Sequence, residues 1–447
     1  MSPEQGFNEA LLGIYTRGAQ ADLYGKELTI GTPEVLAQNY QISANDPYFI
    51  ERKDAIWKGL YHGIVNANLI LEEIDEKERI FTEDNYALIK GEALALRAYF
   101  HLDALRLFAP SYRSNSAAEA IPYVTTYTNQ TTRMSTVSQV MDSIIRDLEL
   151  AKTMLAAVDP ITRPSYIIGY PTQSDTTLNT ETTDELFLQN RRHRMNYYAV
   201  CATLARAYLY RNDKVNALAN AETVIEAERF PWTNTTDFLA VDPDKKDRIL
   251  YKEIIFGWYI PTMNNAYNSS WFNSGTSGMH LHQDETRAIY ETSGPGGNDM
   301  RYTQWFNTVS VNNTFISEVH KYRRNTLGDG PNANLHYMIA PAIRLSEVYY
   351  IAAEASYSTN PQQAADYLDA VRVNRGIGQP VTVSGETAFL REVLKEYRKE
   401  LYAEGQLFYA YKRLHQDIIG HNGVLTPASD AVFVWPLPDD EVIYGQR

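Results

Sequence analysis

Two features that often stabilise or anchor a protein, cysteines and long apolar runs, are almost missing from this sequence. Cys201 is the one cysteine among 447 residues. It cannot form an internal disulfide, and its place on the apolar face of an expected helix is typical of a small core residue. No apolar run reaches the roughly 18 residues that a membrane span needs. The chain opens on Ser2-Pro3-Glu4-Gln5, which is typical of a helix start and not of a signal peptide. We therefore expect a cytosolic protein, or an exported protein whose leader is not part of this sequence.

Positive charge is also in short supply. The chain has 41 Lys and Arg against 55 Asp and Glu, which gives a net charge of −14. Proteins that bind nucleic acid carry a basic patch, and no Lys/Arg block is present in this chain. The short run from Arg191 to Arg194 lies near the acidic Asp184 and Glu185, so we expect it to be a solvated helix start. The sequence predicts no nucleic-acid partner.

Metal-binding and catalytic motifs are weak or absent. His280 and His282 precede Asp284 and Glu285, but no further ligand follows at an informative spacing and there is no HExxH motif. The pattern Asp242-x-Asp244-x2-Asp247 lacks the glycine and the distal glutamate of an EF-hand loop. Neither a phosphate-binding loop nor a nucleophile elbow is found. The sequence therefore predicts no metal and no cofactor.

Three carboxylates, Glu396, Glu400 and Glu404, recur four residues apart and share one face of an expected helix. A glycosidase needs two carboxyl groups about 5–10 Å apart across a cleft. A stripe on one helix is better explained by ion pairs with neighbouring bases. The expected partners are Arg398, Lys399 and Arg413, and similar structural pairs are expected for Glu92 with Arg97 and Glu354 with Arg372.

The most informative stretch present is 342–376, which predicts two helices joined by a tight turn. Apolar and small residues recur with a helical period in each half. Asn360 suits an N-cap and Pro361 the first helical position, and Gly376 suits the end of the second helix. A similar pattern at 206–217 places Asn212 opposite Asn360. Repeated helix pairs with small residues at the crossing are typical of tetratricopeptide repeats.

Further helices are expected at 3–20, 54–75, 83–108, 136–157, 195–210 and 386–416, with a turn at 45–49 and a short extended segment at 431–439. Residues 231–340 are rich in Asn, Gly, Ser and Thr and show little helical period. Because they also contain several tryptophans, we expect an ordered, loop-rich insertion and not disorder. The prediction is a mostly α fold of one domain over 1–447. A tetratricopeptide-like scaffold (1–230 and 341–447) would carry a ligand-binding insertion (231–340).

Five patterns spread in order along the chain resemble the SusD/RagB family of Bacteroidetes outer-membrane lipoproteins. They are Trp57-x3-Tyr61-x2-Ile64-x3-Asn68, the segment from Lys90 to Phe100, Ile343-Arg344-Leu345 with Arg372-x2-Arg375-Gly376, the segment from Glu396 to Arg413, and Trp435-Pro-Leu-Pro438-x2-Glu441. Five matches in sequence are fairly specific together. The family's leader and lipid-bearing cysteine are not in this sequence.

The resemblance implies a helical scaffold whose loop-rich face binds a nutrient. It also implies an outer-membrane surface location through a lipid anchor absent from this sequence, and a SusC-like TonB-dependent barrel as partner. Sugar rings stack on aromatic side chains and their hydroxyls pair with polar groups, a mixture that exposed loops provide. Each ring has an alternative role as a core anchor of its loop. The predicted ligand-binding residues are Tyr48, Trp258, Tyr259, Tyr267, Trp271, Phe272, Asn273 and Trp305; Trp57 and Trp435 are assigned to the scaffold.

The leading hypothesis is thus a non-catalytic protein that binds oligosaccharide or polysaccharide for a transporter. A peptide ligand on the same scaffold is the first alternative. An α-helical glycoside hydrolase and a cytosolic helical-repeat interaction protein are the others. Which glycan is bound cannot be deduced from residue types, because specificity depends on loop geometry.

Overall fold

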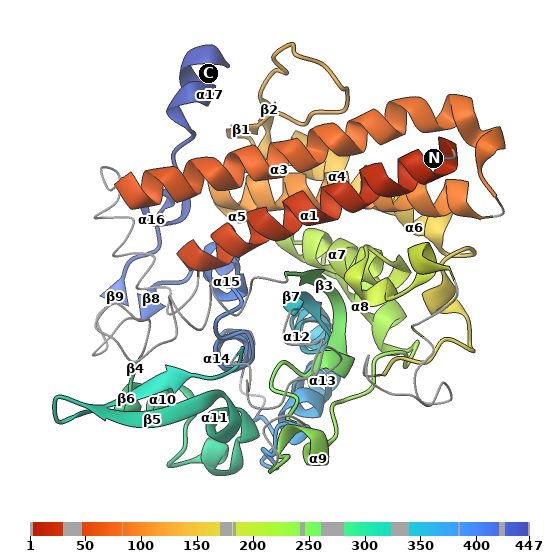
Figure 1. Cartoon of the computed structure of the whole chain (residues 1–447). Coiled ribbons are helices and arrows are strands. Elements are labelled where there is room, and N and C mark those ends of the chain that lie inside the picture. Colours follow the sequence, from red (N-terminus) through yellow and green to blue (C-terminus); the bar gives the residue numbers. More distant parts are fainter. Residues whose placement is uncertain are drawn as a thin grey trace. The chain divides into compact units, whose positions relative to one another are not determined.

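Figure 1 shows the computed structural model of the protein. It describes residues 3–29, 47–82, 84–169, 181, 185–241, 246–260, 281–322, 339–382, 385–419 and 425–445. Helices predominate in the described chain, which confirms the mostly α prediction. The chain divides into two compact units. Unit 1 contains Met1–Arg163, Arg191–Asn220 and Ala403–Arg447, and unit 2 contains Pro164–Asn190 and Ala221–Tyr402. The predicted division into a scaffold and an insertion is a different one and stays a prediction.

Unit 1 is a stack of antiparallel and crossing helices. Its elements are α1 (Pro3–Thr29), α3 (Pro47–Ile74), η1 (Asp75–Ile80), α4 (Asn85–Phe108), α5 (Tyr112–Asn115), β1 (Glu119–Ile121), β2 (Ser135–Thr136), α6 (Val137–Leu155), η2 (Pro160–Thr162), η4 (Arg191–His193), α7 (Tyr197–Tyr210), α15 (Gln406–Leu414), β8 (Ile418–Ile419), β9 (Leu425–Thr426), α16 (Asp430–Phe433) and α17 (Asp439–Tyr444). Helix α1 packs on α3, α3 on α4, α4 on α6, and α6 on α7.

Helix α4 is the core of unit 1 and is buried along almost its whole length. Its buried residues lie on every side, as expected of a helix surrounded by others, and they include charged residues such as Glu92 and Arg97. Small residues let its neighbours approach: a Cβ at Gly91 would lie 2.8 Å from the Leu155 side chain of α6. Its last carbonyls are capped by the C-terminal part of the chain. Lys412 Nζ donates to Arg106 O at 2.6 Å, and the Trp435 N–H donates to Leu107 O at 3.0 Å.

Two predictions for the C-terminal region are wrong. The single helix expected at 386–416 is two helices, α14 (Glu386–Glu400) and α15, because Ala403 and Gly405 adopt left-handed backbone conformations with φ of 63° and 77°. The extended segment expected at 431–439 is non-helical only over 434–438, because α16 ends at Phe433 and α17 begins at Asp439. The second begins with three acidic residues, which favour a helix N-terminus through its dipole.

Unit 2 contains both helices and strands. Its elements are η3 (Leu186–Leu188), α9 (Thr235–Phe238), η6 (Tyr251–Glu253), β3 (Ile254–Tyr259), β4 (Leu281–His282), α10 (Gln283–Ile289), η8 (Pro295–Asn298), α11 (Met300–Trp305), β5 (Phe306–Val311), β6 (Thr314–Val319), β7 (Ile339–Arg344), α12 (Leu345–Ser356), α13 (Pro361–Val373) and α14; helix α8 (Lys214–Ile225) crosses the boundary between the units. Strands β3 and β7 form an antiparallel ribbon, and β4, β6 and β5 form a three-stranded antiparallel sheet in that order.

The predicted helix pair at 342–376 is confirmed as α12 and α13, which pack against each other. Asn360 caps α13 by accepting the Gln363 N–H at 3.2 Å, and Pro361 is the first helical residue. The first three residues of the stretch belong to β7 instead. In the related pair α7 and α8, Asn212 has φ of 66° and Asp213 provides the cap, accepting the Asn216 N–H at 3.2 Å. The aligned Asn212 is therefore a turn residue.

Residues 231–340 contain more helices and strands than the sequence predicted. The hairpin β5–β6 turns at Asn312 and Asn313, with φ of 49° and 64°. Two left-handed residues in a two-residue loop match the twist of the strands on either side. The turn expected at 45–49 also differs, because residues from Pro47 onward form the first turn of α3; Asn45 and Asp46 lie outside the described residues.

Candidate functional site

The exposed end of strand β3 is the starting point for a candidate ligand surface. Every residue of β3 is buried except the last, Tyr259, which is 45% exposed. Tyr259 pairs with Ile339, the first residue of β7. Because the two strands are antiparallel, the chain leaves β3 and enters β7 at the same end of the ribbon. Tyr259 therefore marks the place from which the Asn-rich, aromatic stretch 261–280 departs.

Four of the predicted ligand-binding residues belong to that stretch and lie outside the described residues. They are Tyr267, Trp271, Phe272 and Asn273. Tyr48 lies in the first turn of α3, in unit 1, and its side chain is not among those described. The other predicted residues belong to unit 2, so the structure does not gather all eight within one unit.

Trp258 and Trp305 occupy the interior of unit 2, at 1% exposed each. The Trp258 ring packs edge-on against Phe256, with centroids 4.6 Å apart. Trp305 donates its indole N–H to Arg248 O at 2.6 Å, and Lys321 Nζ lies 4.0 Å from the Trp305 ring centroid. Both rings are placed as anchors of their segments, the alternative that the sequence left open for each aromatic residue. In these positions neither ring presents a face to a ligand.

Phe315 is an exposed ring that the sequence reasoning missed. It lies on β6 next to the hairpin turn, is 59% exposed, and pairs across the strands with Ser310. A hydroxyl beside an exposed ring is the mixture expected for sugar contact. The signal in the sequence was the pair Asn312-Asn313 between alternating residues, a pattern typical of a hairpin.

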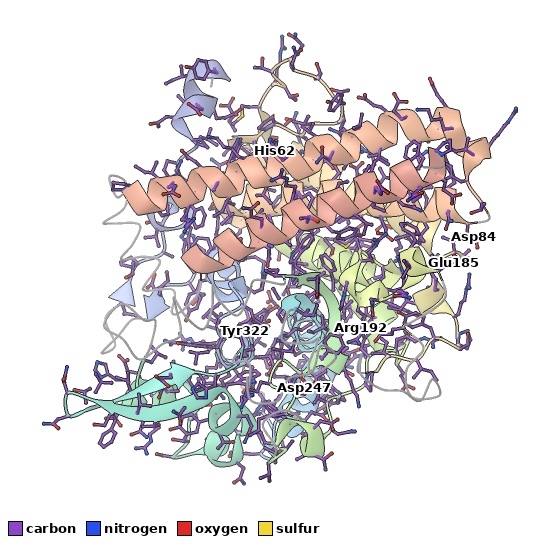
Figure 2. All side chains as sticks on the ribbon, in the orientation of Figure 1. His62, Asp84, Glu185, Arg192, Asp247 and Tyr322 are labelled. Carbon is purple, nitrogen blue, oxygen red and sulfur yellow. The ribbon has the colours of Figure 1, made fainter. Side chains whose placement is uncertain are left out.

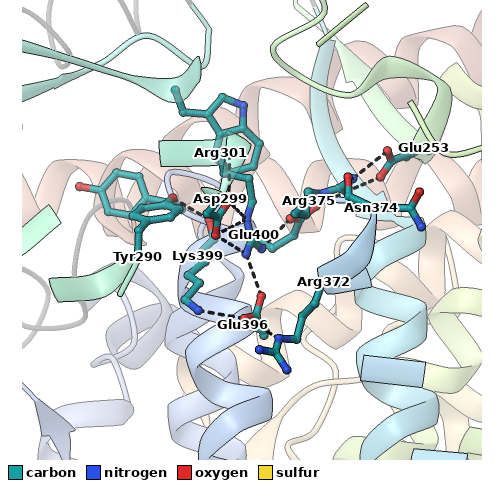
Figure 3. A network of polar contacts seen from close by, with 12 residues as sticks. Glu253, Tyr290, Asp299, Arg301, Arg372, Asn374, Arg375, Glu396, Lys399 and Glu400 are labelled. Carbon is teal, nitrogen blue, oxygen red and sulfur yellow. Dashed lines mark hydrogen bonds and ion pairs between the residues drawn. The ribbon is translucent and has the colours of Figure 1, made fainter. Parts of the chain in front are cut away.

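A buried network of charges in unit 2 links α11, α13 and α14 (Figure 3). Arg301 is its centre and is fully buried. Its guanidinium donates to Asp299 Oδ2 at 2.7 Å, Glu396 Oε2 at 2.9 Å and Glu400 Oε2 at 3.0 Å. Arg375 donates to the other oxygen of Glu400 at 2.7 Å and also binds Glu253. Asp299, Glu253 and Glu400 each meet a guanidinium through both carboxylate oxygens, the strongest ion-pair geometry.

The network favours the charged forms of Glu396 and Glu400. Burial alone raises the pKa of Glu396, but Arg301 and Lys399 lower it below its ordinary value. For Glu400, burial is likewise outweighed, chiefly by Arg375 and then by Arg301, and the pKa falls well below its usual range. A general acid of a glycosidase needs a raised pKa. These two residues are therefore structural, as the sequence predicted.

The partners of the charged residues differ from the predicted ones. The expected pair of Glu396 with Lys399 is present at 2.9 Å, but Glu396 and Glu400 also share Arg301, which is distant in sequence. Glu400 in addition binds Arg375 through both of its oxygens. Arg372 pairs with Asp369 and Glu396. Helical spacing predicts neighbours on one helix and not the contacts between helices.

The basic run at 191–194 is not solvated, contrary to the prediction. Arg191 and Arg192 are 0% exposed, and Arg192 is labelled in Figure 2. Arg191 donates to Glu92 Oε1 at 2.6 Å and to Asp159 Oδ2 at 2.9 Å. Glu92 is thereby paired, and not with Arg97, its predicted partner. Arg97 instead binds Asp147 at 2.7 Å.

The described residues hold no cluster of three His, Cys, Asp or Glu suited to a metal ion. His282 is the residue that caps α10, and its backbone N–H donates to Glu285. Asp247 accepts the Tyr251 N–H at 2.8 Å. His280, Asp242 and Asp244 lie outside the described residues.

A small cavity in unit 1 is lined by residues of α1, α3, α4 and α15, including Asp22, Asp103, Gln406 and Tyr409. Its volume of about 30 Å³ has room for roughly two water molecules, which is too little for a sugar ring. Among the described helices, none is both long and apolar enough to cross a bilayer.

Comparisons with known protein families and solved structures show which proteins share this architecture. The family model described as "Starch-binding associating with outer membrane" matches residues 30–178, and the SusD family model matches residues 258–420. A solved SusD superfamily protein from Bacteroides thetaiotaomicron has a TM-score of 0.73 at 20% identity, over 99% of this chain and 98% of that one. A SusD-like carbohydrate binding protein from Bacteroides vulgatus has a TM-score of 0.73 at 18% identity, over 100% and 97%. Among curated proteins, none matches this chain. The two matched ranges together cover more than half of the sequence, and the chain belongs to the SusD/RagB family.

Proposed function

We propose that the protein binds a glycan on the surface of unit 2 where stretch 261–280 leaves strand β3, and that it does not cleave this glycan. The observation that carries the proposal is the exposed ring of Tyr259 at the end of an otherwise buried strand. Membership of the SusD/RagB family supports it, as does the likeness to a carbohydrate binding protein.

The chemistry of the adjoining sequence supports a sugar as ligand. Tyr259 is followed by Asn264, Asn265, Tyr267 and Trp271. Aromatic faces pack on the apolar faces of sugar rings, and amide side chains both donate to and accept from hydroxyls. The buried charge network around Arg301 holds the segment between β4 and β5 to α14, which gives such a surface a rigid support.

The test is binding of the purified protein to a panel of polysaccharides by affinity electrophoresis and calorimetry. Tyr259→Ala and Trp271→Ala are each expected to weaken binding to the best glycan by roughly tenfold, since a stacked ring contributes about 1 kcal/mol or more. Tyr444→Ala is the matched control, because Tyr444 is 74% exposed in unit 1. A protein that binds no glycan of the panel, or a control that loses as much affinity, contradicts the proposal.

A peptide ligand at the same surface is the second candidate, favoured by the aromatic and amide content that also suits backbone recognition. Competition separates the two. Displacement of a bound labelled glycan by oligosaccharides and not by peptides supports the sugar, and the reverse result selects the peptide.

We further propose that the glycan is passed to a SusC-like TonB-dependent outer-membrane transporter and that a lipid anchor holds the protein at the cell surface. The support is the family and the description of one matching model as associated with the outer membrane. Co-purification of the full-length precursor with such a barrel from outer membranes tests this partner. Recovery of the protein without any barrel contradicts it.

A further inference from the structure

A row of three aromatic rings lies on the helical part of unit 2, separate in sequence from Tyr259. Trp232 and Tyr349 have ring centroids 5.1 Å apart, and Tyr349 and Tyr367 have centroids 6.1 Å apart. All three side chains are partly exposed. Tyr349 comes from α12 and Tyr367 from α13, so the confirmed helix pair sets the spacing.

The rings are inclined to one another by 46° and 72°. Inclined rings form walls and not one flat platform, so a compact group can touch more than one of them. Cationic groups favour such an arrangement because aromatic faces are electron-rich. Trp232 already makes one contact of this kind: the guanidinium carbon of the buried Arg375 lies 5.4 Å from its ring centroid.

Carboxylates of the segment 222–228 lie beside this row. Glu222 accepts the Tyr367 hydroxyl at 2.9 Å. Burial, and next the carboxylate of Glu228, raise the pKa of Tyr349. For Tyr367, burial and the hydrogen bond to Glu222 raise the pKa to about 12, with a smaller contribution from Glu226. The negative side chains of 222–228 therefore act directly on the ring hydroxyls.

Two of these carboxylates lack a counter-charge. Glu226 and Glu228 are exposed, and neither side chain has an ion-pair or hydrogen-bond partner within the described residues. The basic residue that follows them, Arg229, donates to the carbonyl of Pro164 at 3.4 Å. Electron-rich rings beside unpaired carboxylates are complementary to a positive group.

We propose that Trp232, Tyr349 and Tyr367, with Glu226 and Glu228, form a binding site for an arginine or lysine side chain presented by a partner protein. The rings contact the apolar stem of the side chain and make cation–π contacts with its charged group. The two carboxylates supply the counter-charge. The site is independent of the proposed glycan surface, since it uses none of the same residues. The unpaired negative charges of Glu226 and Glu228 favour a positively charged ligand. The occupant is therefore a basic protein segment and not a neutral sugar.

The experiment uses the full chain and a labelled hexa-arginine peptide at low ionic strength, with fluorescence anisotropy as the readout. A hexa-citrulline peptide is the matched probe, nearly identical in shape but uncharged. We expect the arginine peptide to bind, the citrulline peptide to bind at least roughly tenfold more weakly, and added salt to weaken the first. Equal binding of the two peptides overturns the proposal.

Matched variants separate this site from the general attraction of an acidic protein. The double substitution Glu226→Gln and Glu228→Gln is expected to weaken binding by roughly fivefold or more. The control, Glu76→Gln with Glu78→Gln, removes the same charge from exposed residues of η1 in unit 1 and should change affinity by less than about twofold. Equal losses in the two pairs overturn the proposal, as does displacement of the peptide by neutral oligosaccharides.

The aromatic contribution is tested by Trp232→Leu, with the melting temperature measured beside it. A folded variant should lose roughly threefold or more in affinity for the arginine peptide. Unchanged affinity in a folded variant contradicts the role of the ring. If the variant unfolds, the two carboxylate pairs still decide the question, because all four of those side chains are exposed.

Discussion

Arg301 shows how much the position of one side chain matters in unit 2. It is 0% exposed and binds three carboxylates, those of Asp299, Glu396 and Glu400. Removing one member of a buried ionic group leaves the others charged without compensation, which is more harmful than the loss of the attraction itself. The residue is therefore more important to stability than any exposed ion pair.

Arg301→Ala is expected to lower the free energy of unfolding by about 3–5 kcal/mol, measured by urea denaturation. The control is Arg287→Ala, which breaks the exposed pair between Arg287 and Asp284 at 3.9 Å and should cost about 1 kcal/mol or less. Similar losses in the two variants would show that the network contributes little beyond a surface pair.

Lys412 is a buried cation whose surroundings oppose its charge. Its Nζ donates to Arg106 O at 2.6 Å and to Phe433 O at 2.8 Å. Burial lowers the pKa of Lys412 from its ordinary 10.5 to about 7, Asp430 partly offsets this, and Arg106 adds to it. A pKa lower in the folded than in the unfolded chain means that folding releases a proton between these values. Stability therefore rises with pH from about 7 towards 10.5.

The wild type and Lys412→Met are compared across that range by denaturant unfolding. Relative to the variant, the wild type should gain about 2–4 kcal/mol between pH 7 and pH 10, because each unit of pKa difference corresponds to about 1.4 kcal/mol. Groups that titrate equally in both proteins cancel in the comparison. A constant difference across the range would contradict the lowered pKa.

Some of the charged residues were predictable from sequence and others were not. The carboxylates at Glu396 and Glu400 could be assigned to ion pairs because four-residue spacing puts them on one helix face. Their shared partner Arg301 could not be identified, since it reaches them only through the tertiary fold. Arg191 was expected in solvent for the same reason: its partners Glu92 and Asp159 come from other elements.

At the scale of elements, the periodic pattern and the capping residues were enough to predict that a helix is present. They were not enough to predict where most helices begin and end. Asn360 and Pro361 fix the start of α13 by local chemistry, so the sequence suffices. The break between α14 and α15 depends on the left-handed backbone of Ala403, a residue with no turn preference. Strands β3 and β6 have six residues each, but burial along them does not alternate, so a period of two does not reveal them.

The end of α13 gives a prediction that depends on backbone geometry. Gly376 has φ of 88°, and a Cβ there would lie 2.5 Å from Asn298 O, a backbone atom. Gly378 has open space around its Cβ position. Gly376→Ala is therefore expected to cost about 2 kcal/mol or more, while Gly378→Ala should leave stability within about 1 kcal/mol. Thermal and urea unfolding measure both, and equal effects would contradict the close approach to Asn298.

For the whole molecule, the family and the mostly α fold could be predicted from the five ordered sequence patterns, which the two family matches support. For the ligand surface, the sequence predicted the type of residue involved, aromatic rings in polar segments, but not which of these rings face solvent. An aromatic residue in a polar segment can face solvent or anchor the segment, and Tyr259 and Trp258 are adjacent examples of the two outcomes. Trp258 is enclosed with the rest of β3 while Tyr259 is the last residue of the strand, and the sequence alone did not place the end of that strand.

Absence of hydrolysis is the prediction that concerns the whole protein. A glycosidase needs one carboxyl that stays protonated near neutral pH, opposite a second one. Of the described carboxyls with a shifted pKa, Asp369 alone has it raised, by burial first; both its oxygens accept the Val381 N–H and Arg372 binds it. The contacts of Asp369 with Val381 and Arg372 therefore give this carboxyl a structural role.

Incubation of the protein with the glycan that it binds best is therefore expected to release no reducing ends above a protein-free blank, while a known hydrolase added to the same glycan does. Product analysis by chromatography extends the test to oligosaccharides too scarce for a reducing-end assay. Release that persists through repurification and is abolished by Asp369→Asn would make the protein an enzyme and overturn the binding-only proposal. Release that Asp369→Asn leaves unchanged would direct the search to carboxyls elsewhere in the chain, with the same consequence for that proposal.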